Sequence, residues 1–183
     1  AIAAMAIQKI QDDFPDTFSP EDANYMQDVL RGCVDGVAVL SGAVPLGSDA
    51  ETVDAVDSEI QLLRDARKLG PSSYFAYRMG VLSSLVSNVI LPYGFAWTPE
   101  EKALKAKIVR DIDARVESDF SDTSQISKRD PIYEAQDYFK RHRMFREGNR
   151  GILRDDYARG LGYNGLLRKG GPAYFDRATN AVA

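Results

Sequence analysis

The chain has 183 residues, of which 44% are apolar and 27% are charged, values typical of one folded domain with a sizeable core. Its 23 basic and 27 acidic residues leave a net charge of −4, which excludes a chain that is basic overall, as many nucleic-acid-binding proteins are. The single cysteine, Cys33, and the single histidine, His142, exclude a disulfide within the chain and a metal site built from several thiolates or imidazoles.

Apolar residues recur every three or four positions, and Gly and Pro fall between the periodic blocks. This pattern predicts an all-α protein, a single bundle of seven or eight helices. In chain order, the helices are expected at about residues 2–13, 20–40, 51–69, 72–91, 99–116, 131–146, 152–161 and 172–183. No repeat of fixed period is present, so a solenoid is not expected.

Three local signals place the ends of these helices. Ser19 is expected to cap the second helix, and Gly70 with Pro71 is expected to end the third. Thr98 and Glu101 have the spacing of a capping box at the start of the fifth helix. The polar segment 118–129 is predicted to be an exposed loop or linker.

Two glycines interrupt the second predicted helix. Gly32 and Gly36 each cost about 1 kcal/mol relative to alanine inside a helix. They therefore predict close packing or a kink near Cys33, whose apolar neighbours indicate a buried, inert thiol.

The longest stretch without charge includes residues 79–97, but these contain three serines, Asn88 and Pro92. A buried helix fits this composition better than a membrane span, so no integral membrane span is expected. Ala1 opens directly into an amphipathic run, and the chain stops inside another, so processing or truncation is expected. An exported or periplasmic location is compatible with the chain if a signal peptide has been removed.

Charge divides at the predicted linker. Residues 1–127 carry 11 basic and 20 acidic groups, net −9, whereas residues 128–183 carry 12 basic and 7 acidic groups, net +5. The division indicates either a second functional unit or, as we prefer, a basic segment packed on the acidic part of the same bundle.

The segment 160–165 reads G-x-G-x-x-G, but it follows a predicted helix, whereas the dinucleotide-binding loop follows a strand. We therefore predict a helix C-cap and turn. Arg168 and Lys169, with Gly170 and Gly171, are candidates for an amide nest that binds an anion just before the last helix.

Positive charge gathers in residues 140–154, where aromatic residues are interleaved. Phosphates, anionic lipid, nucleic acid or an acidic protein surface would suit this cluster. A solvated helix face with its aromatic residues in the core explains the same residues, and we prefer that interpretation. The candidate anion-binding or partner-binding residues are Arg141, Arg143, Arg146, Arg150, Arg168 and Lys169. No catalytic residue, metal ligand or cofactor is predicted.

The segment 79–94, MGVLSSLVSNVILPYG, resembles the zinc helix of the zinc-dependent phospholipase C and P1 nuclease family, roughly L-G-x-x-L-H-x-x-x-D-x-x-Q-P-x-H. Gly80 and Pro92 match that pattern. Ser84, Asn88 and Gly94 stand where the family has its His, Asp and second His ligands, and Leu91 replaces the Gln. The resemblance implies an all-α bundle, but neutral Ser and Asn are poor zinc ligands, so the family's zinc chemistry is not expected.

The leading hypothesis is therefore a non-catalytic structural or interaction subunit of a larger assembly, a degenerate relative of that family, with a protein partner. The alternative is a phosphodiester or phospholipid hydrolase with a metal bound by carboxylates such as Asp54 and Asp57. A third hypothesis is binding of anionic lipid or nucleic acid through the arginines of residues 141–150.

Overall fold

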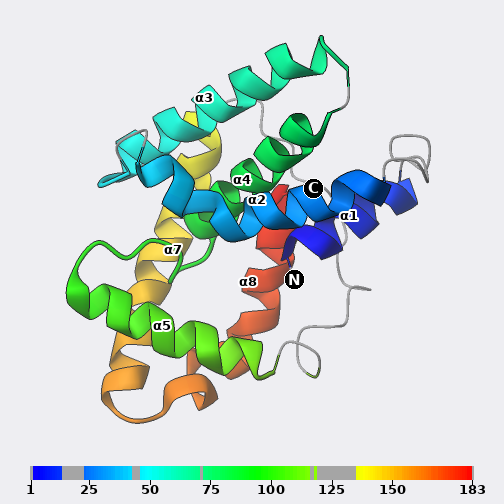
Figure 1. Ribbon diagram of the computed structural model, residues 1–183. Helices are drawn as coiled ribbons and strands as arrows, with labels where there is room; N and C mark the ends of the chain where they lie inside the picture. The colour runs from blue at the N-terminus through cyan, green and yellow to red at the C-terminus, as the bar shows by residue number, and fades with distance from the viewer. Residues whose placement is uncertain are drawn as a thin grey trace.

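The computed structural model describes residues 2–13, 23–42, 46–70, 72–115, 118 and 135–182. Within these ranges the chain forms seven α-helices and one 3-10 helix and no strand, which confirms the all-α prediction. The elements, shown in Figure 1, are α1 (Ile2–Asp13), α2 (Ala23–Ser41), α3 (Asp49–Arg67), α4 (Ser73–Ile90), α5 (Pro99–Asp113), α7 (Ala135–Ala158), η3 (Gly162–Asn164) and α8 (Leu166–Val182).

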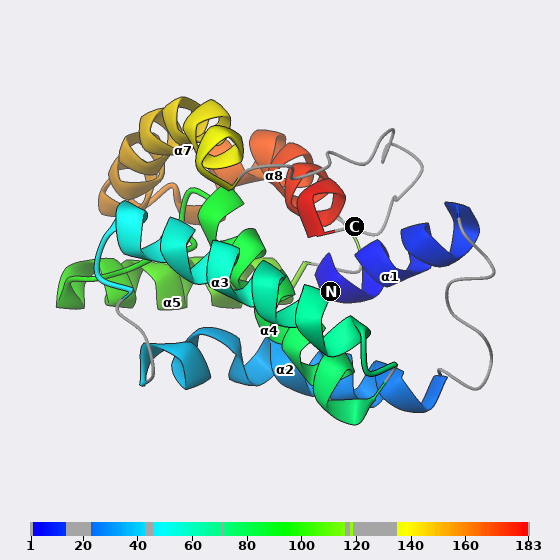
Figure 2. The ribbon, with the colours of Figure 1, turned by 90° about the horizontal axis from the view of Figure 1, so that it is seen from above.

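Helix α4 lies at the centre of the bundle, between α2 on one side and α7 and α8 on the other (Figure 2). The apolar residues on the inner face of α4, from Val81 to Ile90, are buried, and they form one core with apolar side chains of α3, α7 and α8. The fully buried members include Val56, Val81, Leu85, Tyr138 and Ala178. Because each such side chain contributes about 1.5–3 kcal/mol when buried, α4 holds the other helices together.

Helices α2 and α4 make the closest contact in the structure, where two glycines face each other. A Cβ atom added at Gly32 would lie 3.1 Å from the Cα atom of Gly80, and one added at Gly80 would lie 2.9 Å from the Cα atom of Gly32. Helix α2 also has non-helical backbone angles at Gly36. The predicted close packing and the predicted kink are therefore both present.

Capping residues mark where several helices begin or end, and the sequence predicted two of these positions. Ser48 and Ser72 cap α3 and α4, and Thr98 and Glu101 form the predicted capping box of α5. Gly70, just beyond α3, adopts a φ of 88°, which a residue with a side chain rarely adopts. The predicted Ser19 cap lies outside the described residues, as does the segment 119–134.

The predicted break between residues 146 and 152 is wrong, because α7 is one helix of 24 residues. Its glycines Gly148 and Gly151 face open space, so they weaken the helix by only about 1 kcal/mol each. Packing favours continuity: Tyr138 is buried in the core around α4, while Leu153 is buried in a second cluster with Ile108 of α5. One continuous α7 reaches both clusters.

The last helix begins at Leu166 rather than at residue 172, so Pro172 lies inside it. Two contacts explain the earlier start. Leu167 is fully buried in the second cluster, and the amide of Leu166 donates a hydrogen bond of 2.7 Å to Oδ2 of Asp156. In this way a carboxylate from α7 caps α8.

No helix among the described residues combines the length and the apolar character needed to cross a membrane.

Candidate functional site

Small polar residues run along one face of α4. The hydroxyls of Ser83 and Ser87 and the amide of Asn88 each donate to the backbone carbonyl four residues earlier, at 2.7–2.9 Å. These bonds fold the side chains back onto their own helix. As a result, the face is narrow and polar. Together with Ser84 it lines a cavity of about 360 Å³, whose other lining residues come mainly from α1, α2, α5 and α8.

Lys105 reaches from α5 to this face of α4. Its ammonium donates to Oδ1 of Asn88 at 3.2 Å and to the carbonyl oxygen of Gly94. Gly94 lies against Asn88 so closely that a Cβ atom at position 94 would be 2.5 Å from the Cα atom of Asn88. Burial lowers the pKa of Lys105 from its ordinary value. A lysine ammonium thus joins positions 88 and 94.

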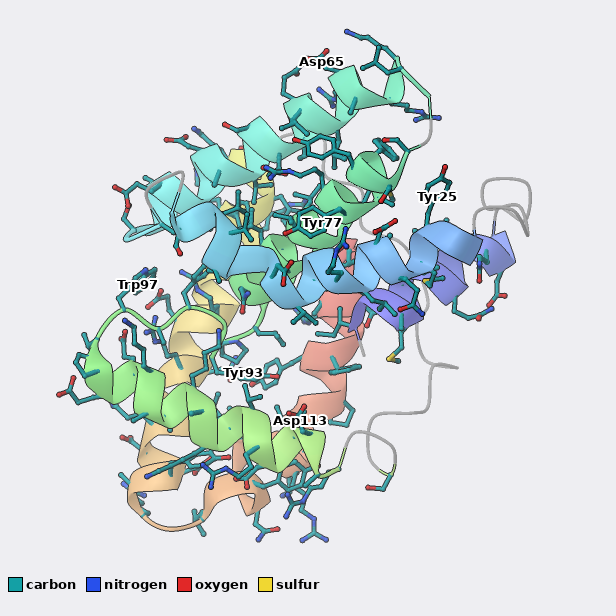
Figure 3. The ribbon with its side chains drawn as sticks, viewed as in Figure 1. Tyr25, Asp65, Tyr77, Tyr93, Trp97 and Asp113 are labelled. Carbon is teal, nitrogen blue, oxygen red and sulfur yellow. The ribbon has the colours of Figure 1, made fainter. Side chains whose placement is uncertain are left out.

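A second cavity, of about 630 Å³, is lined by Lys105 itself. Val37 of α2 forms part of one wall, and α5 forms the other with Lys102, Lys105, Arg110 and further residues. The two cavities share Val109 and Asp113 of α5 as lining residues, and we call the two together the α2–α5 groove. Figure 3 labels Tyr93 and Asp113, the last residue of α5, both of which line the groove.

The groove combines apolar and charged groups. Val34 of α2 is 85% exposed and Val109 of α5 is 37% exposed. Within the described residues, Lys102 and Arg110 form no ion pair, and both are exposed on the α5 wall. Burial, and then the charge of Asp113, raise the pKa of the Tyr93 hydroxyl, so this group is a neutral hydrogen-bonding group at ordinary pH.

The arginines predicted to bind an anion do not gather on one exposed face. Arg146 is buried, pairs with Glu147 at 3.1 Å and lines a separate cavity of about 340 Å³. Arg150 pairs with Glu101 at 2.5 Å and lies over the ring of Trp97, with 5.4 Å to its centroid.

Arg141, by contrast, is exposed and lies over the ring of Tyr138 at 5.5 Å. The side chain of Arg143 is outside the described residues. Arg146 and Arg150 lie one turn apart on α7, and each of them already contacts a carboxylate of this chain.

Arg168 and Lys169 are exposed, but their predicted place before the last helix is wrong, because both lie inside α8. Asp156 already occupies the N-terminus of that helix. The prediction for the segment 160–165 holds: Gly160 and Gly162 have φ angles of 78° and 52°, and the amides of residues 160 and 161 bond back to Tyr157 and Asp156 as in a Schellman cap.

The carboxylates of the alternative hypothesis do not form a metal site in the described part of the chain. Asp54 and Asp57 are both exposed on α3. Among the described residues, no group of three His, Cys, Asp or Glu side chains is placed to hold a metal ion.

Sequence reasoning missed the basic wall of α5. The spacing of residues along α5 could have indicated this wall. One face of the helix carries residues at intervals of three or four, namely Lys102, Lys105, Val109 and Asp113. That face was indistinguishable from a solvated one until the positions of α2 and α4 were known.

No protein-family model, curated protein or solved structure matches this chain.

Proposed function

We propose that this chain is a non-catalytic interaction subunit of a larger assembly, a degenerate relative of the zinc-dependent phospholipase C and P1 nuclease family, and that a protein partner binds in the α2–α5 groove. The observation that carries the proposal is Lys105, whose ammonium bonds to Asn88 and Gly94. These are two of the three positions at which the resemblance places zinc ligands.

The chemistry of this contact supports a binding role over a hydrolytic one. An ammonium has three donors and no lone pair, so it cannot ligate a metal, and its charge would repel a divalent cation held by the same oxygens. Lys105 instead satisfies the amide oxygen of Asn88 and the carbonyl of Gly94, which joins α5 to α4 without a metal.

The shape and composition of the groove support a protein partner. It extends through two adjoining cavities and exposes apolar side chains, Val34 above all, beside charged residues of α5. An apolar strip with a charged rim is the usual composition of a protein interface. Arg146 and Arg150 are held by Glu147 and Glu101, which leaves the cluster on α7 less suited to phosphates.

The test compares two matched variants of the protein, purified from its native source without chelators. Val34→Arg with Val109→Arg places charge in the groove, whereas Leu69→Arg changes a side chain that is 92% exposed and lines neither cavity. We expect a stoichiometric partner in native mass spectrometry with the wild type and with the Leu69 variant, and loss of that partner from the groove variant.

The same preparations are analysed for metal and for hydrolysis of bis(p-nitrophenyl) phosphate. Near-stoichiometric zinc with activity that a chelator abolishes would refute the proposal. So would a partner-free monomer, or a partner that the groove variant retains at the wild-type ratio.

A further inference from the structure

We infer that the occupant of the α2–α5 groove is an acidic amphipathic helix of the partner protein. This inference rests on the proposed function and specifies the chemistry that the groove recognises.

The charge of the α5 wall indicates an acidic occupant. Lys102, Lys105 and Arg110 line the same cavity, and among the described residues that line it Asp113 is the one carboxylate. They form a local basic strip in a part of the chain, residues 1–127, whose overall net charge is −9. Because Lys102 and Arg110 pair with no carboxylate among the described residues, carboxylates of an incoming segment would be their first such partners.

The apolar residues indicate that the occupant also has an apolar face. Val34 and Val37 on α2 face the groove opposite Val109 on α5, and Phe95 lies between the helices in the same lining. An amphipathic helix places apolar residues at i, i+3, i+4 and i+7 on such a strip while its remaining residues reach the rim.

The floor and the length of the groove fit a helix rather than a small molecule. The floor consists of small side chains of α4, Ser83, Ser84 and Ser87, which permit close approach. The α5 residues that line the groove run from Lys102 to Asp113, a stretch of 12 residues that is about 18 Å long at 1.5 Å per residue. An occupant helix of similar length would contact both cavities at once.

The experiment measures binding of two labelled synthetic helical peptides to the full chain by fluorescence anisotropy. Both peptides have the length of α5 and the same leucine face, and their polar positions are glutamate in one and lysine in the other. We expect the glutamate peptide to bind at least about tenfold more tightly than the lysine peptide, with a preference that weakens as salt is raised.

Charge-reversal variants test whether the α5 wall causes the preference for the glutamate peptide. Lys102→Glu with Arg110→Glu should reverse the preference between the peptides. Lys107→Glu is the matched control, because Lys107 is exposed on α5 but lines neither cavity, and it should leave the preference unchanged. Val34→Arg with Val109→Arg should weaken binding of both peptides.

Equal binding of the two peptides, no binding of the glutamate peptide, or equal effects of the two charge-reversal changes would overturn the inference. Tighter binding of a single-stranded oligonucleotide than of the glutamate peptide would overturn it in favour of nucleic acid. The two failures are distinguishable. If the native partner is lost from the Val34 and Val109 variant but kept by the charge-reversal variant, the proposed function stands and this inference fails, because the groove then binds a partner of another chemistry.

Discussion

Replacement of Gly80 by alanine tests the packing that positions α2 on α4. A Cβ atom at this position would overlap the carbonyl oxygen of Val29 and lie 2.8 Å from the backbone nitrogen of Cys33. Ordinary contacts require about 3.5–4.0 Å, so the two helices would have to separate by about 1 Å. Since the obstacles are backbone atoms, no side-chain rotation can relieve the overlap.

A gap of about 1 Å removes a quarter to a half of the dispersion energy at each contact it opens. Overpacking typically costs about 1–3 kcal/mol, and we expect Gly80→Ala to lower the free energy of unfolding by about 3 kcal/mol or more. The assay is urea denaturation followed by circular dichroism, which gives that free energy directly for each variant.

Gly148→Ala is the matched control, because Gly148 is also inside a helix but has no atom within 4 Å of its added Cβ. This change should raise the free energy of unfolding by about 0.5–1 kcal/mol through helix propensity alone. The packing argument is refuted if Gly80→Ala costs less than about 1 kcal/mol, or if the two variants are destabilised alike.

Three further measurements follow from individual side chains. The side chain of Glu59 is 5% exposed and pairs with Arg78, so Glu59→Gln should lower the free energy of unfolding by about 3–5 kcal/mol. Glu59→Leu with Arg78→Met removes both charges and should recover most of that free energy. Equal losses of stability in the two variants would contradict the pairing. Partial burial acts to raise the pKa of Glu101, but the amides of Trp97 and Thr98 and then the Arg150 guanidinium lower it below its ordinary 4.5. The advantage of the wild type over Glu101→Gln in denaturation should therefore be present above pH 4.5 and disappear as the pH falls through the lowered pKa, and a pH-independent difference would refute this. Partial burial raises the pKa of Cys33 from 9.0 to about 11. Alkylation of this thiol at pH 8 should therefore be about 100-fold slower in the folded protein than in denaturant, and similar rates in the two would contradict the raised pKa.

The boundaries of the helices were predictable wherever a short signal fixed them. Thr98 and Glu101 lie three residues apart, so their reciprocal hydrogen bonds depend on nothing outside one turn of helix. Gly70 ends α3 for an equally local reason. The break expected near Gly148 was wrong because glycine only weakens a helix, whereas burial of Tyr138 and Leu153 in two different clusters stabilises α7 as a whole.

The sequence alone determined that this chain is a bundle of amphipathic helices, since the three-to-four spacing of apolar residues and the caps are properties of neighbouring positions. Only the tertiary structure decided which charged side chains already have a partner within this chain. Arg146 and Arg150 belong to a segment that is basic in sequence, but in the structure they form ion pairs with Glu147 and Glu101. Lys105 of α5 donates hydrogen bonds to Asn88 and Gly94. Such contacts depend on how helices are placed against each other, and that placement arises from the burial of the whole core, not from any short stretch of residues.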